Sequence, residues 1–466
     1  MSGAPRLRVL TLLVTTIATL AGLFVGPAAH AATVDEAAAA LGIRGNYQLV
    51  RITATGNITT ALAGATKTAA TAELPRVVAL PAGGLQVTAQ IRVANHVYLV
   101  AEPGTTVVLS GAAGQLLWFN GVTSGVYGGS WDASRRSDGV IGAKASVLRL
   151  ARLTVRNAAK NGVAAYARST LTLTDVASTG NAKDGVYADA STVTVTRLRA
   201  TKNRRNGLQL SAGSVGTVAD STLDGNGLAV TGSTTGKTGH GLGIASSRAR
   251  VTGTSMASNR VCGVSMTGSV DVALTGVTLS ANGRHGLGTT PGARASLTDS
   301  VVAGNGYNGV LASGSGTQLR LAGVTITRSA RHGLSVPSKG AATLQGSTIT
   351  ASGGSNVSVS AKGTLSILGA NVIADGRSEG ITVTGESRLT VSGDGNRVGS
   401  NRANGLVVSG KRTTGRITRP VTFEANRKHG ILVKTKAKLA TVTNSFARNK
   451  GKATHLQSGG KITKVA

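Results

Sequence analysis

Two histidines and an asparagine, His285, Asn308 and His332, occupy the same place in three successive segments of this chain, and Tyr307 lies directly before Asn308. Imidazole and phenol groups can transfer protons, and an amide can hydrogen bond a carboxylate. β-Elimination in a uronic-acid polymer needs a base for the C5 proton, an acid for the leaving oxygen and a group that neutralises the carboxylate. We therefore predict these four as candidate catalytic residues, with one histidine as base, Tyr307 as acid, and Asn308 or a neighbouring arginine as neutraliser.

The same place in other segments is also polar, nearly always directly before a recurring glycine. This row reads Asn161, Asp184, Asn206, His240, Cys262, His285, Asn308, His332, Ser355, Glu379, Asn404 and His429. The residue before it is often basic, and we predict that six such residues bind substrate: Lys160, Lys183, Arg205, Arg284, Arg331 and Lys428. A stripe of cations favours an anionic ligand. The competing interpretation is that Asn and His recur because both tolerate the turn before a glycine.

The recurring phrase is an Asn, three residues, then Gly followed by Val, Leu or Ile. Asn181 to Gly185 and Asn203 to Gly207 are examples, and most successive glycines lie 22 to 25 residues apart. Fixed self-similarity of this length predicts a solenoid. Each glycine opens an alternating run, and a second run rich in Thr and Val follows, so every second side chain can point inward. The leucine-dense phrase of leucine-rich repeats is absent, and the pattern favours an all-β parallel β-helix.

The recurring asparagines predict a structural ladder. Identical amides stacked one coil apart can hydrogen bond to each other and to turn backbones. Ser329, Ser352 and Gly376 replace the asparagine in three coils, where we expect the ladder to be interrupted. The predicted members are Asn157, Asn181, Asn203, Asn226, Asn259, Asn282, Asn305, Asn401, Asn426 and Asn449.

The first 31 residues have the pattern of a secretory signal. Arg6 and Arg8 precede an apolar run from Val9 to Val25, and Ala29-His30-Ala31 has the form of a cleavage site. An uncleaved membrane anchor is the competing interpretation, but Thr and Gly interrupt the run. We expect a secreted, extracellular protein with no membrane span after signal removal.

Composition predicts a basic, disulfide-free rod. Lys and Arg total 50 against 18 Asp and Glu, and the 56 residues from Lys411 onward hold 14 basic residues against Glu424 alone. This field favours an anionic polysaccharide or another cell-wall polymer as partner, with non-specific nucleic-acid binding as a lesser prediction. Cys262 is the single cysteine, interpreted as a small tolerated residue. We expect no cofactor and no metal, because acidic residues average about one per coil, too few for a calcium site.

Alanine-rich stretches from Asp35 to Leu41 and from Thr59 to Ala72 predict short helices. We expect them to cap the open end of the stack within a cap region at 32–75. Strands should begin at Val77 and form a β-helix over 76–456, followed by a basic tail at 457–466. An expansion at 227–240 is predicted to form a flap over the stripe.

"LPAGG" from Leu80, "GGSWD" from Gly128 and the N-x-x-x-G coils resemble the right-handed parallel β-helix proteins of the pectin lyase-like superfamily. The resemblance covers roughly Val77 to Leu456 and implies a right-handed coil. It is specific for fold and weak for chemistry, because that superfamily includes lyases, hydrolases, epimerases and phage tailspikes.

"GHGLGI" at Gly239 to Ile244 resembles the Gly-His-Gly motif of polygalacturonases. Carried over, the resemblance implies His240 as the histidine and Asp184 as an earlier catalytic aspartate. The intervening coil has Arg205 and Asn206 where that family has paired aspartates, so the general acid is missing. Glycoside hydrolysis needs two carboxylates, which disfavours it here.

We therefore predict a secreted parallel β-helix that binds an anionic extracellular polysaccharide along a basic face, with processing left open. A uronic-acid polysaccharide lyase is the second hypothesis and a non-catalytic structural or adhesive surface protein the third. The sequence does not decide whether the chain is an enzyme. If it is one, a lyase is favoured over a glycoside hydrolase.

Overall fold

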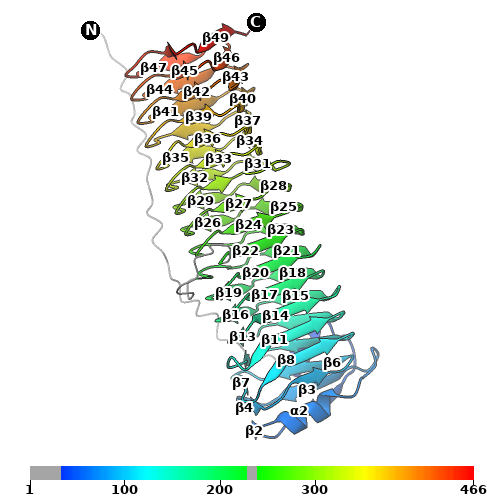
Figure 1. The fold of residues 1–466 in the computed structure, drawn as a ribbon. Helices are drawn as coiled ribbons and strands as arrows, with labels where there is room; N and C mark the ends of the chain where they lie inside the picture. Colours follow the sequence, from blue (N-terminus) through cyan, green and yellow to red (C-terminus); the bar gives the residue numbers. More distant parts are fainter. Residues whose placement is uncertain (1–32, 228–238, 466) are drawn as a thin grey trace, which may run out of the picture.

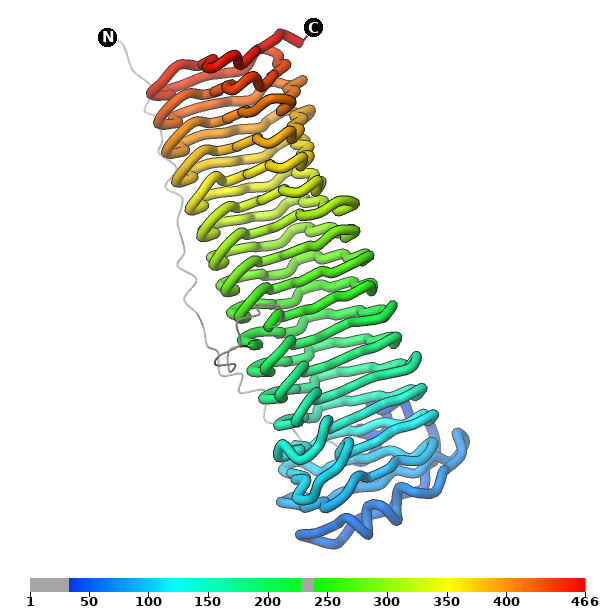
Figure 2. Tube along the Cα trace, in the orientation of Figure 1, coloured from blue at the N-terminus to red at the C-terminus, as the bar shows by residue number. Residues whose placement is uncertain are grey.

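The computed structural model describes residues 33–227 and 239–465, which form a long rod of stacked coils (Figures 1 and 2). Every strand pairing within it is parallel, and each coil contributes up to three strands, one to each of three faces that we call A, B and C. The predicted all-β parallel β-helix is confirmed. The predicted signal peptide and most of the 227–240 expansion lie outside the described residues.

Face A is one 18-stranded sheet. Its strands are β1 Gln48–Arg51, β3 Arg76–Leu80, β6 Val97–Ala101, β9 Thr123–Tyr127, β12 Val147–Ala151, β15 Thr170–Thr174, β18 Thr192–Thr196, β21 Val215–Ala219, β23 Arg248–Thr252, β25 Val270–Thr275, β28 Ala293–Thr298, β31 Gln318–Ala322, β34 Ala341–Gln345, β37 Thr364–Ile367, β40 Arg388–Val391, β43 Thr414–Ile417, β46 Lys438–Thr441 and β49 Lys461–Lys464.

Face B consists of a seven-stranded and an eight-stranded sheet, joined by isolated bridges through Thr222 and Ser255. Its strands are β2 Gly56–Asn57, β4 Gly83–Val87, β7 Thr105–Leu109, β10 Ser130–Asp132, β13 Thr154–Arg156, β16 Ala177–Thr179, β19 Arg199–Thr201, β26 Thr278–Ser280, β29 Val301–Ala303, β32 Thr325–Thr327, β35 Thr348–Thr350, β38 Val372–Ala374, β41 Asn396–Gly399, β44 Val421–Glu424 and β47 Ser445–Ala447.

Face C is one 16-stranded sheet. Its strands are β5 Ile91–Val93, β8 Ala113–Asn120, β11 Ser137–Lys144, β14 Asn161–Tyr166, β17 Val186–Asp189, β20 Leu208–Ser211, β22 Leu242–Ala245, β24 Val264–Thr267, β27 Leu287–Thr289, β30 Val310–Leu311, β33 Leu334–Val336, β36 Val357–Val359, β39 Ile381–Thr384, β42 Leu406–Ser409, β45 Ile431–Lys434 and β48 Thr454–Gln457.

Alternation within each strand builds the core. In β18, Val193 and Val195 are buried while Thr192 and Thr194 are exposed, and β15 repeats the pattern one coil earlier. The inward side chains of all three faces join one continuous apolar cluster along the rod. Burial of this cluster is the main stabilising force, and each coil depends on its neighbours for it.

The two helices pack against different parts of the stack. In α2 (Thr59–Thr66), Ile58 at the N-cap and Leu62 are fully buried in the main core cluster, so this helix covers the end of the stack (Figure 1). In α1 (Val34–Ala40), Ala37 and Ala38 pack with Tyr98 in a separate cluster. The prediction that both helices cap the open end is therefore wrong for α1, because its apolar side meets outward-facing aromatics of face A.

The predicted boundaries of the β-helix were too narrow. Two strands, β1 and β2, precede Val77, and β1 pairs with β3 in parallel register. At the other end, residues 457–466 are not a separate tail, because β49 continues face A by pairing with β46. Among the described residues, no helix is long and apolar enough to cross a membrane.

Candidate functional site

The candidate site lies along the edge where each coil passes from face B to face C, which we call the BC edge. A ladder asparagine opens the turn, one or two exposed residues follow, and a row residue ends it just before the face-C strand. Backbone hydrogen bonds link the same turn positions of neighbouring coils, as from Arg284 N–H to the Val261 carbonyl (2.7 Å) and from Tyr307 N–H to the Arg284 carbonyl (2.7 Å). Matching letters of successive repeats therefore lie above one another.

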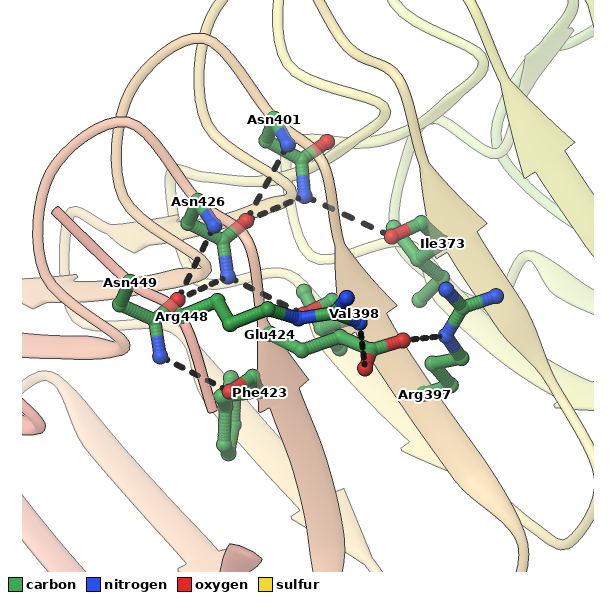
Figure 3. Close-up of polar contacts among 9 residues, drawn as sticks. All are labelled: Ile373, Arg397, Val398, Asn401, Phe423, Glu424, Asn426, Arg448 and Asn449. Atoms are coloured by element: carbon green, nitrogen blue, oxygen red, sulfur yellow. Dashed lines mark hydrogen bonds and ion pairs between the residues drawn. The ribbon is translucent and has the colours of Figure 1, made fainter. Parts of the chain in front are cut away.

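The asparagine ladder is buried and fully hydrogen bonded in the coils where it is continuous. Nδ2 of Asn181 donates to Oδ1 of Asn203 (2.8 Å), and Nδ2 of Asn203 donates to the Ser178 carbonyl (3.1 Å). The same contacts repeat from Asn181 to Asn305, and again from Asn401 through Asn426 to Asn449 (Figure 3). Each amide satisfies backbone groups that the turn would otherwise leave unpaired.

Asn157 is not a ladder member, which corrects the prediction. Its φ of 58° places it at the left-handed position that precedes the ladder, and Ala158 takes the ladder place, donating its N–H to Oδ1 of Asn181 (3.0 Å). The Asn157 amide donates instead to both carboxylate oxygens of Asp132 (3.1 and 3.0 Å). The cause is one additional residue between Asn157 and Gly162, which shifts the asparagine by one position.

The three coils before Asn401 lack the ladder asparagine, as predicted from the sequence, but Asn356 bridges part of the gap. Its Nδ2 donates to Oδ1 of Asn401 (3.1 Å), and its Oδ1 accepts from the Ser352 N–H (3.2 Å). The bridge fits because Gly376 lies between them, where an added Cβ would be 2.9 Å from Nδ2 of Asn356. The hydroxyls of Ser329 and Ser352 are buried without a partner among the described residues.

The row forms a second ladder beside the first. Oδ1 of Asn161 accepts from the Asp184 N–H (3.2 Å), Oδ1 of Asp184 from the Asn206 N–H (3.0 Å), and Oδ1 of Asn308 from the His332 N–H (3.2 Å). Most row side chains are buried, although His332, Glu379 and His429 are partly exposed. A side-chain acceptor one coil away explains the recurrence of Asn, Asp and His without requiring catalysis.

Asp184 is a buried carboxyl with incomplete hydrogen bonding. Its side chain is fully buried, and Oδ2 has no hydrogen-bond partner among the described residues. Burial raises the pKa of Asp184 to about 6, although Arg205, whose Nε lies 3.8 Å from Oδ1, opposes the shift. Two coils later, Nδ1 of His240 accepts from the Cys262 N–H (3.3 Å). Asp184 and His240 therefore occupy the same row, with Asn206 between them.

His285 and Cys262 lie on adjacent coils of the row, and both are held neutral by burial. Burial, with a smaller contribution from Arg284, lowers the pKa of His285 to about 4. Burial raises the pKa of the Cys262 thiol to about 11. The His285 side chain is only 5% exposed, and its Nδ1 has no partner within the part of the chain that the structure describes. A neutral imidazole is chemically suited to accept a proton, but little of it reaches the surface.

Tyr307 joins the predicted catalytic residues into one cluster. Its ring meets the His285 ring edge-on, with centroids 5.4 Å apart. The Arg331 guanidinium lies 4.9 Å from the centre of the Tyr307 ring and donates to its hydroxyl. Nδ1–H of His332 donates to the Ser355 carbonyl (3.1 Å), and burial lowers the pKa of His332. The structure thus brings all four candidate residues together, with Tyr307 and Arg331 on the solvent side.

The six basic residues predicted to bind substrate share one turn position of the BC edge, but two of them are engaged by carboxylates. Lys160 pairs with Asp138 (2.7 Å), and Arg205 with Asp184. The other four side chains form no ion pair with any described carboxylate, and all are exposed. They are Lys183, Arg284, Arg331 and Lys428.

A second basic column on this edge was missed by sequence analysis. The exposed residue directly after the ladder position is Arg377, Arg402, Arg427 and Lys450 in four successive coils. The signal was present in the repeat as the residue directly after each ladder position, one place before the column that contains Arg284 and Arg331. Tyr166 and Tyr187 on face C, whose ring centroids are 5.8 Å apart, were also not predicted as neighbours.

The right-handed β-helix family model matches residues 138–326 and 308–465. The chain therefore belongs to the family described as a right-handed β-helix region, and the predicted resemblance to pectin lyase-like β-helices is confirmed at the level of fold. No curated protein matches the chain significantly.

Solved structures with a similar fold include pectate lyase Pel9A, at 12% identity, with 56% of this chain and 77% of that one covered and a TM-score of 0.42. The A-module of mannuronan C-5 epimerase AlgE4 from Azotobacter vinelandii is 15% identical, with 88% and 96% covered and a TM-score of 0.34. PfbA, a surface adhesin of Streptococcus pneumoniae, is 13% identical, with 83% and 87% covered and a TM-score of 0.28. Similarity at this level concerns the fold and does not assign an activity.

Proposed function

We propose that this protein is exported and binds an anionic extracellular polysaccharide along the BC edge. The observation on which this rests is the set of exposed cations without carboxylate partners, above all Arg284, Arg331 and Lys428 in the column predicted from the sequence. Like charges in neighbouring coils, as in the column Arg377, Arg402, Arg427 and Lys450, repel one another and are costly to maintain without a counter-charge. A polyanion running parallel to the rod would supply that counter-charge.

The spacing of these cations suits a linear polymer. Coils follow one another at about 4.8 Å, so Arg284 and Arg331, two coils apart, are separated by about 10 Å along the rod. Arginine forks bind carboxylate groups through two parallel hydrogen bonds, which favours a uronic-acid chain over a neutral one. In the C-terminal coils the column that begins at Arg377 continues the positive edge.

Uronate lyase activity is a second candidate, supported by the contacts among Arg331, Tyr307 and His285. In such a reaction His285 would accept the C5 proton and the C4–O bond would break. Tyr307 would then give its proton to the leaving oxygen, and a C4–C5 double bond would form. Arg331 would hold the carboxylate. The limited exposure of His285 makes access to the C5 proton the critical requirement.

The test compares two double variants on the full mature chain. Arg284→Ala/Arg331→Ala removes two BC-edge charges, and Arg388→Ala/Arg416→Ala removes two exposed charges from face A. We expect polygalacturonate to bind the wild type, the BC-edge pair to weaken binding by about tenfold or more, and the control to change it little. An equal loss of affinity in the two double variants would mean that the polymer responds only to the overall charge of the protein. Absence of binding to any acidic glycan would favour a structural role.

The same samples separate binding from catalysis. Formation of the C4–C5 double bond is followed by ultraviolet absorbance during long incubation with polygalacturonate. A rise that disappears in Tyr307→Phe would support the lyase, provided that this variant still binds the polymer. Binding without any rise in absorbance would leave recognition as the function and remove the lyase hypothesis for that substrate.

A further inference from the structure

Face A has a hollow of about 470 Å³ on its outer surface, over strands β25, β28, β31 and β34. A second hollow of about 190 Å³, over β21, β23 and β25, shares Asp271 and Ala273 with the first. These strands follow one another along the rod (Figure 1), so the two hollows form one groove parallel to its axis. We call it the face-A groove, and its larger part lies within the ~300–1,000 Å³ range of small-ligand sites.

The groove exists because small side chains lie between long ones. Along one outward column of face A, Arg250, Ala273, Ser296 and Arg320 are paired in register on four successive strands. At about 4.8 Å per strand, the two arginines are about 14 Å apart along the axis, with the small residues forming the floor between them. This separation leaves room for a ligand of several rings.

A parallel column of the same strands carries alternating charges. Arg248, Asp271 and Arg294 are paired in register on β23, β25 and β28. None of these three side chains forms an ion pair with a described residue, and no carboxylate pairs with Arg250 or Arg320 either. Arg320 donates one hydrogen bond to Oε1 of Gln345 (3.2 Å), which fixes its position and leaves further N–H groups available.

The mixture of charges limits the chemistry of the ligand. Four arginines around the groove favour carboxylate or other oxyanion groups, which a guanidinium binds through paired hydrogen bonds. Asp271 would repel a bare anion, but an ionised carboxylate accepts hydrogen bonds from hydroxyl groups. A ligand that satisfies both must present anionic groups and hydroxyls in alternation, and an acidic oligosaccharide does so.

We propose that the face-A groove is a binding site for a short acidic oligosaccharide, with Arg294 and Arg320 holding its carboxylates and Asp271 accepting from its hydroxyls. The site lies on a different face from the BC edge. It does not depend on the function proposed for that edge, and the two can be tested separately.

The probe is trigalacturonate, titrated calorimetrically into the full mature chain. The groove variant Arg294→Ala/Arg320→Ala is compared with Arg388→Ala/Arg416→Ala, which removes the same charges from the same two columns of face A beyond the groove. All four side chains are exposed, so the variants should fold equally well. We expect the affinity for trigalacturonate to fall about tenfold or more in the groove variant and less than about twofold in the control.

Asp271→Ala distinguishes sugar recognition from simple anion attraction. If Asp271 accepts sugar hydroxyls, its removal weakens trigalacturonate binding. Tighter binding would mean that the groove only attracts negative charge, and the proposal would be overturned. Loss of trigalacturonate binding in Arg284→Ala/Arg331→Ala but not in the groove variant would also refute the groove site while supporting the BC edge. The reverse pattern would support the groove and count against the edge.

Discussion

The BC edge is built in two ways along one rod. In the middle coils the position directly after the ladder is a small residue, in order Gly283, Gly306, Ala330 and Gly353, whereas in the C-terminal coils it is Arg377 and its three basic successors. The turns of the middle coils stack tightly, since a Cβ at Gly306 would lie 2.4 Å from the Gly283 carbonyl oxygen. The C-terminal coils instead admit long side chains at this position and display charge to solvent.

The ladder behind this edge does not follow the same division, because Arg402, Arg427 and Lys450 come directly after intact ladder asparagines. It is continuous from Asn181 to Asn305, then passes through two serines and a glycine before resuming at Asn401. The two regions teach that this turn either stacks closely through a small residue or displays a long basic side chain, and that an intact ladder is compatible with both. Variants matched between the two regions test this distinction.

The largest effect is expected from the ladder amides. Asn282→Ala would leave the Asn259 N–H and the Met256 carbonyl without their partners, and we expect a loss of about 3 kcal/mol in the free energy of unfolding. Ser352→Ala removes a buried hydroxyl that has no partner among the described residues and should change stability by less than about 0.5 kcal/mol. Urea unfolding of both variants gives the comparison, and equal losses would contradict it.

A buried carboxyl in the row should make stability depend on pH. The folded pKa of Asp184, about 6, lies above its ordinary value, so ionisation costs stability and the free energy of unfolding falls as pH rises through this range. Asp184→Asn keeps the acceptor for the Asn206 N–H and should gain about 2–3 kcal/mol at pH 8 relative to its effect at pH 4. A pH-independent difference between the two proteins would show that Asp184 ionises freely.

Gly306 should be sensitive to an added side chain, whereas Arg402 at the equivalent position should not be sensitive to truncation. Gly306→Ala forces a methyl group against the backbone, and we expect the free energy of unfolding to fall by about 2 kcal/mol. Arg402→Ala removes an exposed side chain from the equivalent position and should stay within about 0.5 kcal/mol. Thermal unfolding decides between them, and a tolerant Gly306 would mean that the middle coils can open as the C-terminal ones do.

The smallest expected effect is a gain in stability. Ser329→Asn should extend the continuous ladder by offering Oδ1 to the Asn305 N–H, at a place where the existing serine hydroxyl is unpartnered. We expect about 1 kcal/mol of added stability in urea unfolding. A loss would show that the serine coils are too tightly packed for an amide.

The sequence was sufficient to predict the coil, its period and the shared edge of His285 and His332, because all three follow from a repeat that can be counted. It also placed nine of the ten asparagines correctly. Asn157 was misplaced because a single inserted residue shifts a turn position without changing the letters around it. Asn356 was missed because it occupies the usual glycine position and acts in a gap three coils long.

Burial of the candidate site could not be read from spacing. A residue before a face-C strand can point to solvent or stack on the neighbouring coil, and only coordinates show that Asp184 and His285 do the latter. The sequence likewise does not show that Lys160 and Arg205 are engaged by carboxylates while Arg284 and Arg331 are not. The exposed arginines are therefore better candidates for contact with a ligand than the buried histidines.

The most direct test of the central claim is the salt dependence of polygalacturonate binding. If the BC edge neutralises charges along the polymer, the logarithm of the affinity should fall linearly with the logarithm of salt concentration, and Arg284→Ala/Arg331→Ala should reduce that slope by roughly one to two. The Arg388→Ala/Arg416→Ala control should keep the wild-type slope. A wild-type slope near zero, or one that the BC-edge variant leaves unchanged, would contradict the account.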